Sequence, residues 1–271
     1  MGEALWAIPL GFAVGAYGTL IGAGGGFVLM PILLVLFPAE NPERLTSISL
    51  AVVFLNAASG SWAYARRKRI EYRSGLIFSA ATVPGAVIGA MTTAVLPRQL
   101  FNGVFGVLLV MASILLLARR EVTGNRRVRH TPFTVDRKIV DADGTTQTIA
   151  YDARAGLLIS FVVGFLSSLL GIGGGILHVP MLVHLLGFPV HIATATSHFV
   201  LAIMALAGTG VHIASGILAQ GLTLTIFLGI GVIAGAQIGA AWSARIHGVW
   251  ILRGLALALA IVGIRILCMA F

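Results

Sequence analysis

The most informative stretch of this chain is Ile21-Gly-Ala-Gly-Gly-Gly-Phe-Val-Leu-Met-Pro31. Its pattern is repeated 149 residues further on, in Leu170-Gly-Ile-Gly-Gly-Gly-Ile-Leu-His-Val-Pro180. Other blocks recur at nearly the same offset: Thr46–Ser49 matches Thr194–Ser197, and the pair Gly85 and Gly89 matches Gly235 and Gly239. An almost constant offset across separate blocks is difficult to obtain by chance. The sequence therefore predicts an internal duplication.

The composition is that of a membrane protein. Of the 271 residues, 58% are apolar and 10% are charged, and the mean hydropathy is +1.00. A soluble domain usually carries about 25% charged residues, so an ordinary soluble enzyme is excluded, as is a disordered chain. The 34 glycines suit closely packed or broken membrane helices. The single cysteine excludes an intrachain disulfide and a cysteine-based metal site.

Apolar runs predict ten membrane segments, five in each half. A spanning helix needs roughly 20 residues, and two of the segments, 27–37 and 176–187, are too short. The first two segments of each half are therefore either two full spans or a hairpin that enters the membrane and returns, and the glycine run favours the hairpin or a break. The ten segments are 4–21, 27–37, 46–64, 75–96, 99–118, 155–170, 176–187, 193–214, 222–244 and 250–270.

Basic residues set the predicted orientation. Thirteen of the 18 Lys and Arg residues lie in two stretches, 66–73 and 119–154, between apolar segments. Cytoplasmic loops are enriched in Lys and Arg, so both stretches are expected inside the cell and both termini on the periplasmic side. Each half then crosses the membrane an odd number of times, which gives the halves opposite topology. Inverted repeats of this kind are typical of secondary transporters.

The predicted domains are a first transmembrane repeat over 1–118, a cytoplasmic basic loop over 119–154 and a second transmembrane repeat over 155–271. Within the loop, Ile139–Thr146 carries an Asp-Gly pair that predicts a β-hairpin. The expected role of this loop is a linker, with a regulatory contact as the alternative. No nucleic-acid partner is expected, since the basic stretches are not interleaved with aromatic residues.

The glycine runs indicate an anion site. All nine acidic residues lie at chain ends or in loops, so the membrane offers no carboxylate for a proton relay or a cation. Glycines break a helix and leave N–H groups unpaired, and the helices that follow, from near Phe27 and Ile176, point their positive dipole ends at the breaks. The alternative is that the glycines serve only close helix packing. A nucleotide loop is excluded, because no Lys-Ser/Thr follows either run.

On these motifs the chain resembles the TauE/SafE sulfite exporter family of membrane proteins. The resemblance rests on Gly22–Gly26 with Pro31, on Gly171–Gly175 with Pro180, and on the Ala195-Thr196-Ser197 block followed by Gly208. It covers about 10–118 and 155–270 and leaves out the central loop. It implies movement of sulfur-containing anions such as sulfite, sulfoacetate or thiosulfate across the bacterial inner membrane. Family substrates vary, so the anion itself stays open.

Residues around the two breaks are the candidates for substrate binding. The glycines would offer backbone N–H groups, and polar side chains in apolar stretches would add neutral hydrogen bonds, since an unpaired amide in hydrocarbon is costly. Serine and threonine often bond back to their own helix, which is the alternative for them. The predicted set is Gly24, Gly25, Gly26, Gly173, Gly174, Gly175, Ser49, Ser197, Asn56, His198 and Gln237.

Three histidines are candidates for proton coupling. His178, His198 and His212 align with Leu29, Leu50 and Tyr64 of the first half, so the second half alone carries them. Histidine is the side chain that changes charge near neutral pH, and it is the best proton carrier in spans without carboxylates. The alternative for each is a histidine hydrogen-bonded within the helix bundle.

The sequence thus predicts an all-α polytopic membrane protein with two inverted-topology repeats, each a glycine-broken helical hairpin plus spanning helices. The expected function is a secondary transporter of a small sulfur-containing anion, with the bacterial inner membrane as its location and the lipid bilayer as its environment. An anion channel is the nearest alternative. An intramembrane enzyme is the other, but catalytic motifs such as His-Glu-x-x-His and Gly-x-Ser-x-Gly are absent. No catalytic residue, metal site or cofactor is expected, and the oligomeric state is left open.

Overall fold

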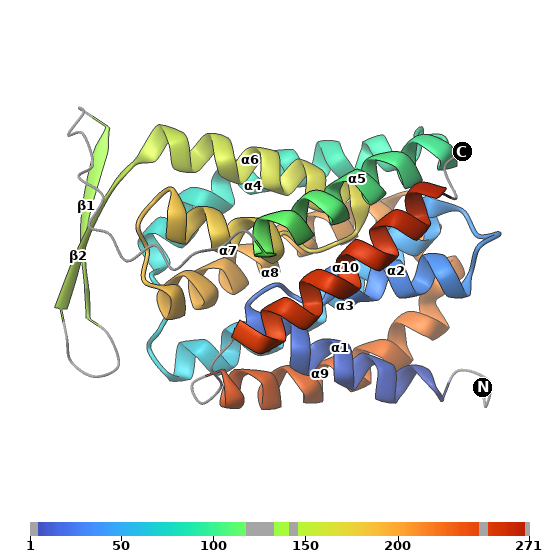
Figure 1. Ribbon diagram of the computed structural model, residues 1–271, viewed down its shortest axis with the longest axis horizontal. Helices are drawn as coiled ribbons and strands as arrows, with labels where there is room; N and C mark the ends of the chain where they lie inside the picture. Colours follow the sequence, from blue (N-terminus) through green and yellow to red (C-terminus); the bar gives the residue numbers. More distant parts are fainter. Residues whose placement is uncertain (1–4, 118–132, 141–145, 244–248, 269–271) are drawn as a thin grey trace.

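A computed structural model describes residues 5–117, 133–140, 146–243 and 249–268 (Figure 1). Both chain ends, which were predicted to be periplasmic, lie outside the described residues. So does most of the predicted basic loop over 119–154, including its Asp-Gly turn.

The described residues form ten α-helices, and each contains most of one predicted apolar segment. Five helical stretches are long and apolar enough to cross a membrane: α3, α4, α6, α8, and η2 with α9. The prediction of a helical, multi-pass membrane protein is confirmed. The helices are α1 (Ala7–Ile21), α2 (Gly26–Leu36), α3 (Pro42–Arg66), α4 (Tyr72–Thr93), α5 (Arg98–Leu117), α6 (Ala153–Leu170), α7 (Gly175–His184), α8 (Val190–Ala214), α9 (Leu222–Trp242) and α10 (Val249–Cys268), with a 3-10 turn, η2 (Ile217–Gly221), before α9.

Short polar side chains mark where three of the long helices begin. Asn41 accepts a hydrogen bond from the Glu43 N–H at 2.9 Å before α3, and Pro42 occupies the first turn. Glu71 and Asp152 accept in the same way before α4 and α6. Each side chain satisfies one of the N–H groups that a helix start leaves unpaired. The starts of these spans are therefore written in the sequence.

The glycine runs end α1 and α6 and turn the chain back. Gly22 (φ 82°) and Gly171 (φ 66°) cap the two helices in the left-handed conformation that favours glycine. The 11 residues of α2 span about 16 Å, roughly half the thickness of a hydrocarbon core. In Figure 1, α1 runs from the right-hand end to the middle and α2 returns to the right, whereas α6 and α7 do the same from the left. Of the two alternatives, the structure has hairpins.

The two glycine turns meet in the middle of the bundle. A Cβ on Gly26 would lie 2.6 Å from the carbonyl oxygen of Ile172, and one on Gly175 would collide with the carbonyl oxygen of Gly22. Real Cβ atoms do not approach backbone so closely, so both contacts require glycine. Each turn is therefore part of the packing surface of the other.

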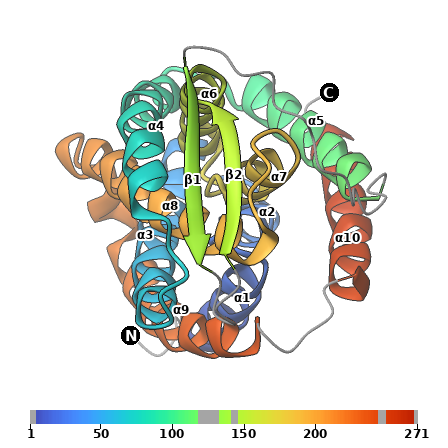
Figure 2. The same ribbon diagram turned by 90° about the vertical axis from the view of Figure 1, so that its left-hand side faces the viewer.

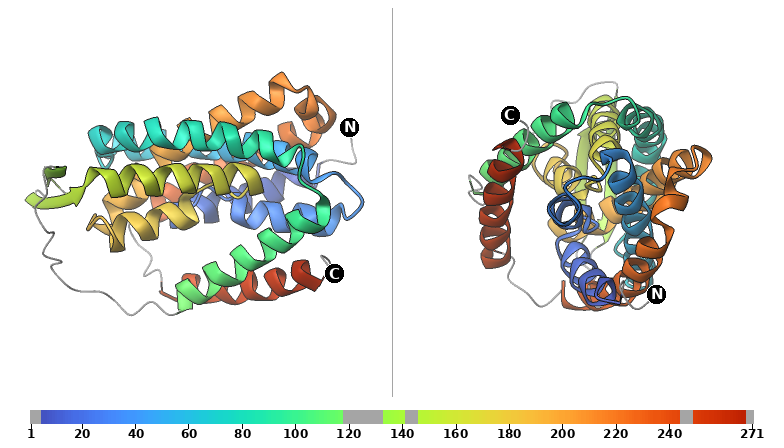
Figure 3. Two further views of the ribbon diagram at one scale, coloured as in Figure 1. Left: turned by 90° about the horizontal axis from the view of Figure 1, so that it is seen from above. Right: turned by 90° about the vertical axis from the view of Figure 1, so that its right-hand side faces the viewer.

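Helices at matching positions of the two halves make matching contacts. Helix α1 packs along α9, and α6 packs along α4, while α3 packs on α8 and α5 on α10. Glycines allow the closest of these approaches: Gly85 and Gly89 face the α6 backbone, and Gly235 and Gly239 face that of α1. These four glycines serve close packing. The α5–α10 pair lies to one side of the other helices (Figure 3).

A β-hairpin covers one end of the bundle. Strand β1 (Thr134–Val140) pairs antiparallel with β2 (Thr146–Asp152), and β2 leads directly into α6. The hairpin predicted around Ile139–Thr146 is confirmed and is longer than predicted. Figure 2 shows it lying across the ends of α4, α6, α7 and α8. We call this the hairpin end of the molecule, and the other the opposite end.

Candidate functional site

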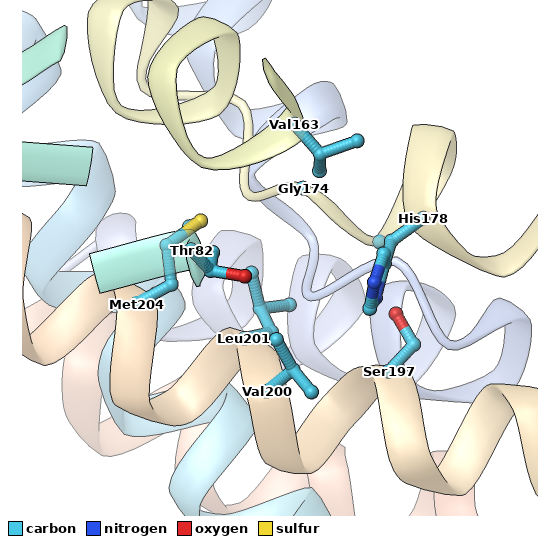
Figure 4. Close-up of a pocket in the computed structure, with 9 residues that line it drawn as sticks. Thr82, Val163, Gly174, His178, Ser197, Val200, Leu201 and Met204 are labelled. Carbon is cyan, nitrogen blue, oxygen red and sulfur yellow. The ribbon is translucent and has the colours of Figure 1, made fainter. Parts of the chain in front are cut away.

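A small cavity lies at the second glycine turn, where α7 begins (Figure 4). Four helices and the turn itself surround it. It has room for roughly one water molecule. Its walls are formed by Thr82, Val163, Gly174, Gly175, His178, Ser197, Val200, Leu201 and Met204.

Ser197 on α8 presents an unpaired hydroxyl to this cavity. The residue is fully buried, and its Oγ has no hydrogen-bond partner among the described residues. Figure 4 shows the hydroxyl pointing toward the imidazole of His178. A buried hydroxyl without a partner costs free energy, which a ligand with acceptor oxygens would recover.

His178 on α7 forms the facing wall. Its Nε2 lies 3.4 Å from the Ser160 hydroxyl, which is longer than an ordinary hydrogen bond. The ring of Phe78 approaches it edge-on, with 5.9 Å between centroids. The imidazole is therefore held by packing, and its polar atoms are not saturated by strong partners.

The backbone of the second turn supplies further donors. The N–H groups of Leu177 and His178 both donate to the Gly174 carbonyl, at 3.1 and 2.8 Å. Those of Gly175 and Ile176 precede them in the first turn of α7 and donate no hydrogen bond within the part of the chain that the structure describes. The positive end of the α7 dipole lies at the same place. The cavity thus combines unpaired donors with a favourable potential for an anion.

The first glycine turn has filled surroundings. Gly24 lies against the Leu201 side chain, and Gly25 lies beside the Asn56 amide. The Oδ1 atom of Asn56 accepts a hydrogen bond from Thr19 at 2.8 Å, while its Nδ2 atom has no partner among the described residues. Asn56 therefore keeps one free donor next to the first turn, outside the cavity.

Ser49 and Gly173 mark where the second turn contacts α3. The Ser49 hydroxyl donates to the Gly171 carbonyl at 2.5 Å, so it supports the second turn from outside the cavity wall. Gly173 lies against Val53, where a Cβ would come within 2.9 Å of the valine side chain. Both residues act on the backbone of the turn.

The other two predicted histidines lie away from the cavity. His198 faces the opposite side of α8, where its ring meets Tyr64 edge-on at 5.6 Å and Gly60 leaves space for it. Both ring nitrogens of His198 are buried without a hydrogen-bond partner among the described residues. His212 is fully buried one turn from Gly208. Neither lines the cavity.

Gln237 is separate from both glycine turns. It is exposed on α9, and its Nε2 donates to the backbone and side-chain oxygens of Ser59 at 2.8 Å. The structure thus brings Gly174, Gly175, Ser197 and His178 together at one cavity, places the remaining glycines, Ser49 and Asn56 next to it, and leaves Gln237 apart.

Sequence reasoning missed Thr82 and Met204. Thr82 reaches the cavity because α4 of the first half packs on α6 of the second, where Gly164 meets its backbone. This packing of a first-half helix on a second-half helix leaves no local pattern in the sequence. Its indirect signal is the small-residue spacing of Gly85 and Gly89, one turn further along α4.

Comparison with known proteins identifies the family. The sequence profile of "Sulfite exporter TauE/SafE" matches residues 7–266. This chain belongs to the TauE/SafE family. The resemblance inferred from the two glycine runs is confirmed.

Curated relatives of this TauE/SafE chain carry transporter names. "Probable membrane transporter protein YunE" of Bacillus subtilis is 35% identical over 77% of this chain and 78% of its own length. A "Probable membrane transporter protein" of Methanocaldococcus jannaschii is 26% identical over 76% and 72%, and YdhB of Bacillus subtilis is 25% identical over 94% and 97%. No solved structure matches. Membership and names together identify a multi-pass membrane transporter.

Proposed function

We propose that this TauE/SafE protein is a secondary transporter that moves a small sulfur-containing anion across the bacterial inner membrane by alternating access. The anion would be sulfite, thiosulfate or an organosulfonate such as sulfoacetate. The observation that carries the proposal is the cavity at the start of α7, where the Ser197 hydroxyl and two backbone N–H groups have no partner among the residues that the structure describes.

The chemistry of the cavity favours an anion with several oxygens. None of its wall residues is a carboxylate or a permanent cation, so binding relies on neutral donors and the α7 dipole. Sulfite and sulfonates present three acceptor oxygens around one sulfur, which suits donors that converge from a turn, a hydroxyl and an imidazole. A cation would meet the positive end of a helix and no compensating charge.

The small size of the cavity supports alternating access over an open pore. A sulfite ion has four heavy atoms, whereas the cavity has room for roughly one water molecule, so binding requires the site to open. We infer that the two halves, 1–118 and 155–271, are inverted repeats that rock about the meeting glycine turns. Hairpins that return to opposite ends support this arrangement (Figure 1).

Orientation and coupling complete the proposal. We place the hairpin end, with Arg66, Arg67 and Lys68 exposed beside it, on the cytoplasmic side and both chain ends on the periplasmic side. Among the three candidate proton carriers, His178 stands in the cavity wall, so it is the one that would exchange a proton in step with the anion. His198 and His212 are the alternatives.

Counterflow in liposomes tests the transport proposal. Purified protein would be reconstituted, and uptake of labelled sulfite, thiosulfate and sulfoacetate would be measured with and without the same unlabelled anion inside. A transporter gives uptake that the internal anion accelerates, whereas a channel gives none of this acceleration. Absence of movement for all three anions, under ion and pH gradients of either sign, would refute the proposal.

Coupling is tested in the same vesicles. His178→Leu is expected to abolish the dependence of uptake on the pH gradient, while His198→Leu and His212→Leu retain it. A variant at His198 or His212 that alone removes the pH dependence would transfer the role to that residue.

A further inference from the structure

An aromatic cluster lies between the cavity and the hairpin end. It consists of Phe78 on α4, Tyr151 on β2 and Phe188 just before α8, and we call it the inner aromatic cluster. The ring centroids are 5.6 Å apart for Phe78 and Tyr151, 6.1 Å for Phe78 and Phe188, and 5.5 Å for Tyr151 and Phe188. All three side chains are almost fully buried. The three rings are therefore packed against one another inside the protein.

The cluster adjoins the cavity directly. Phe78 stands one helical turn before Thr82 of the cavity wall, and its ring meets His178 of the same wall edge-on. On its other side Phe78 presses on Gly156 of α6, where a Cβ would lie 2.6 Å from the ring. An anion that leaves the cavity toward the hairpin end must therefore pass Phe78 and the rings behind it.

One of the three rings comes from the soluble hairpin. Tyr151 is 1% exposed, its hydroxyl lies 2.6 Å from the Ser74 hydroxyl of α4, and Ile149 of the same strand is buried beside it. A linker between two membrane halves does not need to insert a tyrosine among helix ends. Figure 2 shows the hairpin crossing the middle of this face, over the helices that surround the cavity.

The opposite end is closed by different chemistry. There Arg44 pairs with Glu40 at 2.7 Å and donates to the Gln220 carbonyl at 2.7 Å, and Arg98 donates to the Glu40 carbonyl. This network is polar and partly exposed, and no soluble element covers it among the described residues. Within the described residues, the aromatic cluster that includes a strand residue lies at the hairpin end.

We propose that Tyr151, with Phe78 and Phe188, forms the inner gate of the transport route, and that the β-hairpin withdraws Tyr151 when the cavity opens toward the hairpin end. The proposal rests on the proposed function in one respect, namely that the cavity is the substrate site. Tyr151 is a positioning residue: it touches the cluster and not the anion. Its hydrogen bond to Ser74 fixes the closed position.

Cysteine labelling from each side of the membrane tests this gate. The only native cysteine is Cys268, so Cys268→Ser gives a thiol-free background into which Ser197→Cys places a reporter in the cavity wall. The rate of modification by a membrane-impermeant methanethiosulfonate would be measured in inside-out and right-side-out vesicles. We expect Tyr151→Ala to raise the rate at least tenfold from the hairpin side and to leave the rate from the other side unchanged.

Two further variants keep the test sharp. Tyr151→Phe retains the ring and loses the bond to Ser74, so the rate from the hairpin side should rise about threefold, and Ser74→Ala should match it. Tyr72→Ala is the control. Tyr72 is an exposed tyrosine at the start of α4, the helix that also carries Ser74 and Phe78, and it packs edge-on against Phe199 outside the cluster. It should leave both rates unchanged.

The outcomes separate the gate from general loosening. Unchanged labelling in Tyr151→Ala, Tyr151→Phe and Ser74→Ala would overturn the proposal, and so would an equal rise from both sides. If Tyr151→Ala fails to fold, the two milder variants decide. Labelling requires no substrate, so a chain that moves no sulfur-containing anion can still show a side-specific gate, and failure of the two proposals is distinguishable.

Discussion

The two glycine turns have nearly the same sequence and opposite surroundings. At the first turn, the side chains that match the cavity wall are Leu29 and Val232, which are fully buried in the apolar core. At the second turn, the matching residues are His178 and Thr82, and a cavity lies between them. The first turn therefore packs against apolar side chains at these positions, while the second turn borders a small cavity at the matching positions.

The matching serines show the same contrast. Ser49 donates to the Gly171 carbonyl, whereas Ser197, 148 residues later, faces the cavity and has no partner in the described part of the chain. The serine of the first half thus stabilises the second turn by a hydrogen bond. Two copies of one backbone motif thus have different side-chain surroundings, and under the proposed function we expect a single anion per chain.

The largest effect on stability is expected from substitutions at the glycines through which the two turns contact each other. Gly175→Ala puts a Cβ onto the Gly22 carbonyl, and Gly26→Ala puts one 2.6 Å from the Ile172 carbonyl. Overpacking of backbone on backbone should lower the free energy of unfolding by about 3 kcal/mol in each variant. Thermal unfolding in detergent measures this, and transport should fall below a tenth.

Gly210→Ala is the control for these two variants. Gly210 is also helical, but nothing lies within 4 Å of a Cβ there, so alanine should raise stability by up to about 1 kcal/mol. Tolerance of alanine at only one of Gly26 and Gly175 would show that the two turns do not support each other equally.

The second prediction separates the two serines. Ser197→Ala removes an unpaired hydroxyl, so stability should stay the same or rise slightly, while transport efficiency falls about tenfold, because a hydrogen bond to a charged group contributes about 1.5–3 kcal/mol. Ser49→Ala leaves the Gly171 carbonyl unpaired, so stability should fall by about 1–3 kcal/mol, with less than a threefold change in transport.

Thermal unfolding and initial uptake rates of the two serine variants, compared at matched protein density, decide the contrast. If both serines lower transport equally without a stability change, the first turn also binds substrate, and the distinction between scaffold and site is wrong.

The smallest effect is expected at Gln237. Its side chain is exposed and binds Ser59, away from both turns. Gln237→Ala should change the free energy of unfolding by less than about 0.5 kcal/mol and leave uptake unchanged. A clear loss of uptake with normal stability would bring α9 into the site.

The helices could be predicted because their signals are local. Hydropathy located all ten segments, Asn41 and Glu71 cap their helices in the way such residues usually do, and Asp143-Gly144 indicated the hairpin between β1 and β2. The choice between spans and hairpins could not be made, since charge bias leaves the same loops on the same sides in both. The contact between Gly26 and Ile172 decides between spans and hairpins, and these two residues are 146 positions apart in the sequence.

The site could be predicted only in part. Glycine runs and the Thr-Ser block pointed to Gly174, Gly175 and Ser197 because broken helices leave donors unpaired. The sequence carried no mark of which turn would be hollow, since this depends on the volumes of side chains such as Leu29 that meet there in three dimensions. The proposed gating role of Tyr151 could not be predicted from the sequence either, because its partners Phe78 and Phe188 lie in distant segments.

The two helix N-termini that lie close together have a consequence for the charge of the anion that can bind. Each N-terminus carries roughly half a positive elementary charge. Helix α7 begins in the cavity wall at Gly175, and α2 begins at Gly26 against the turn before α7, so together the two helices offer at most about one positive charge. A monoanion bound there would be nearly neutralised by backbone alone. A dianion would bring one negative charge too many, and a proton taken up by His178 would restore the balance. The stoichiometry of proton and substrate should therefore follow the charge of the anion, with hydrogen sulfite needing no proton where thiosulfate needs one.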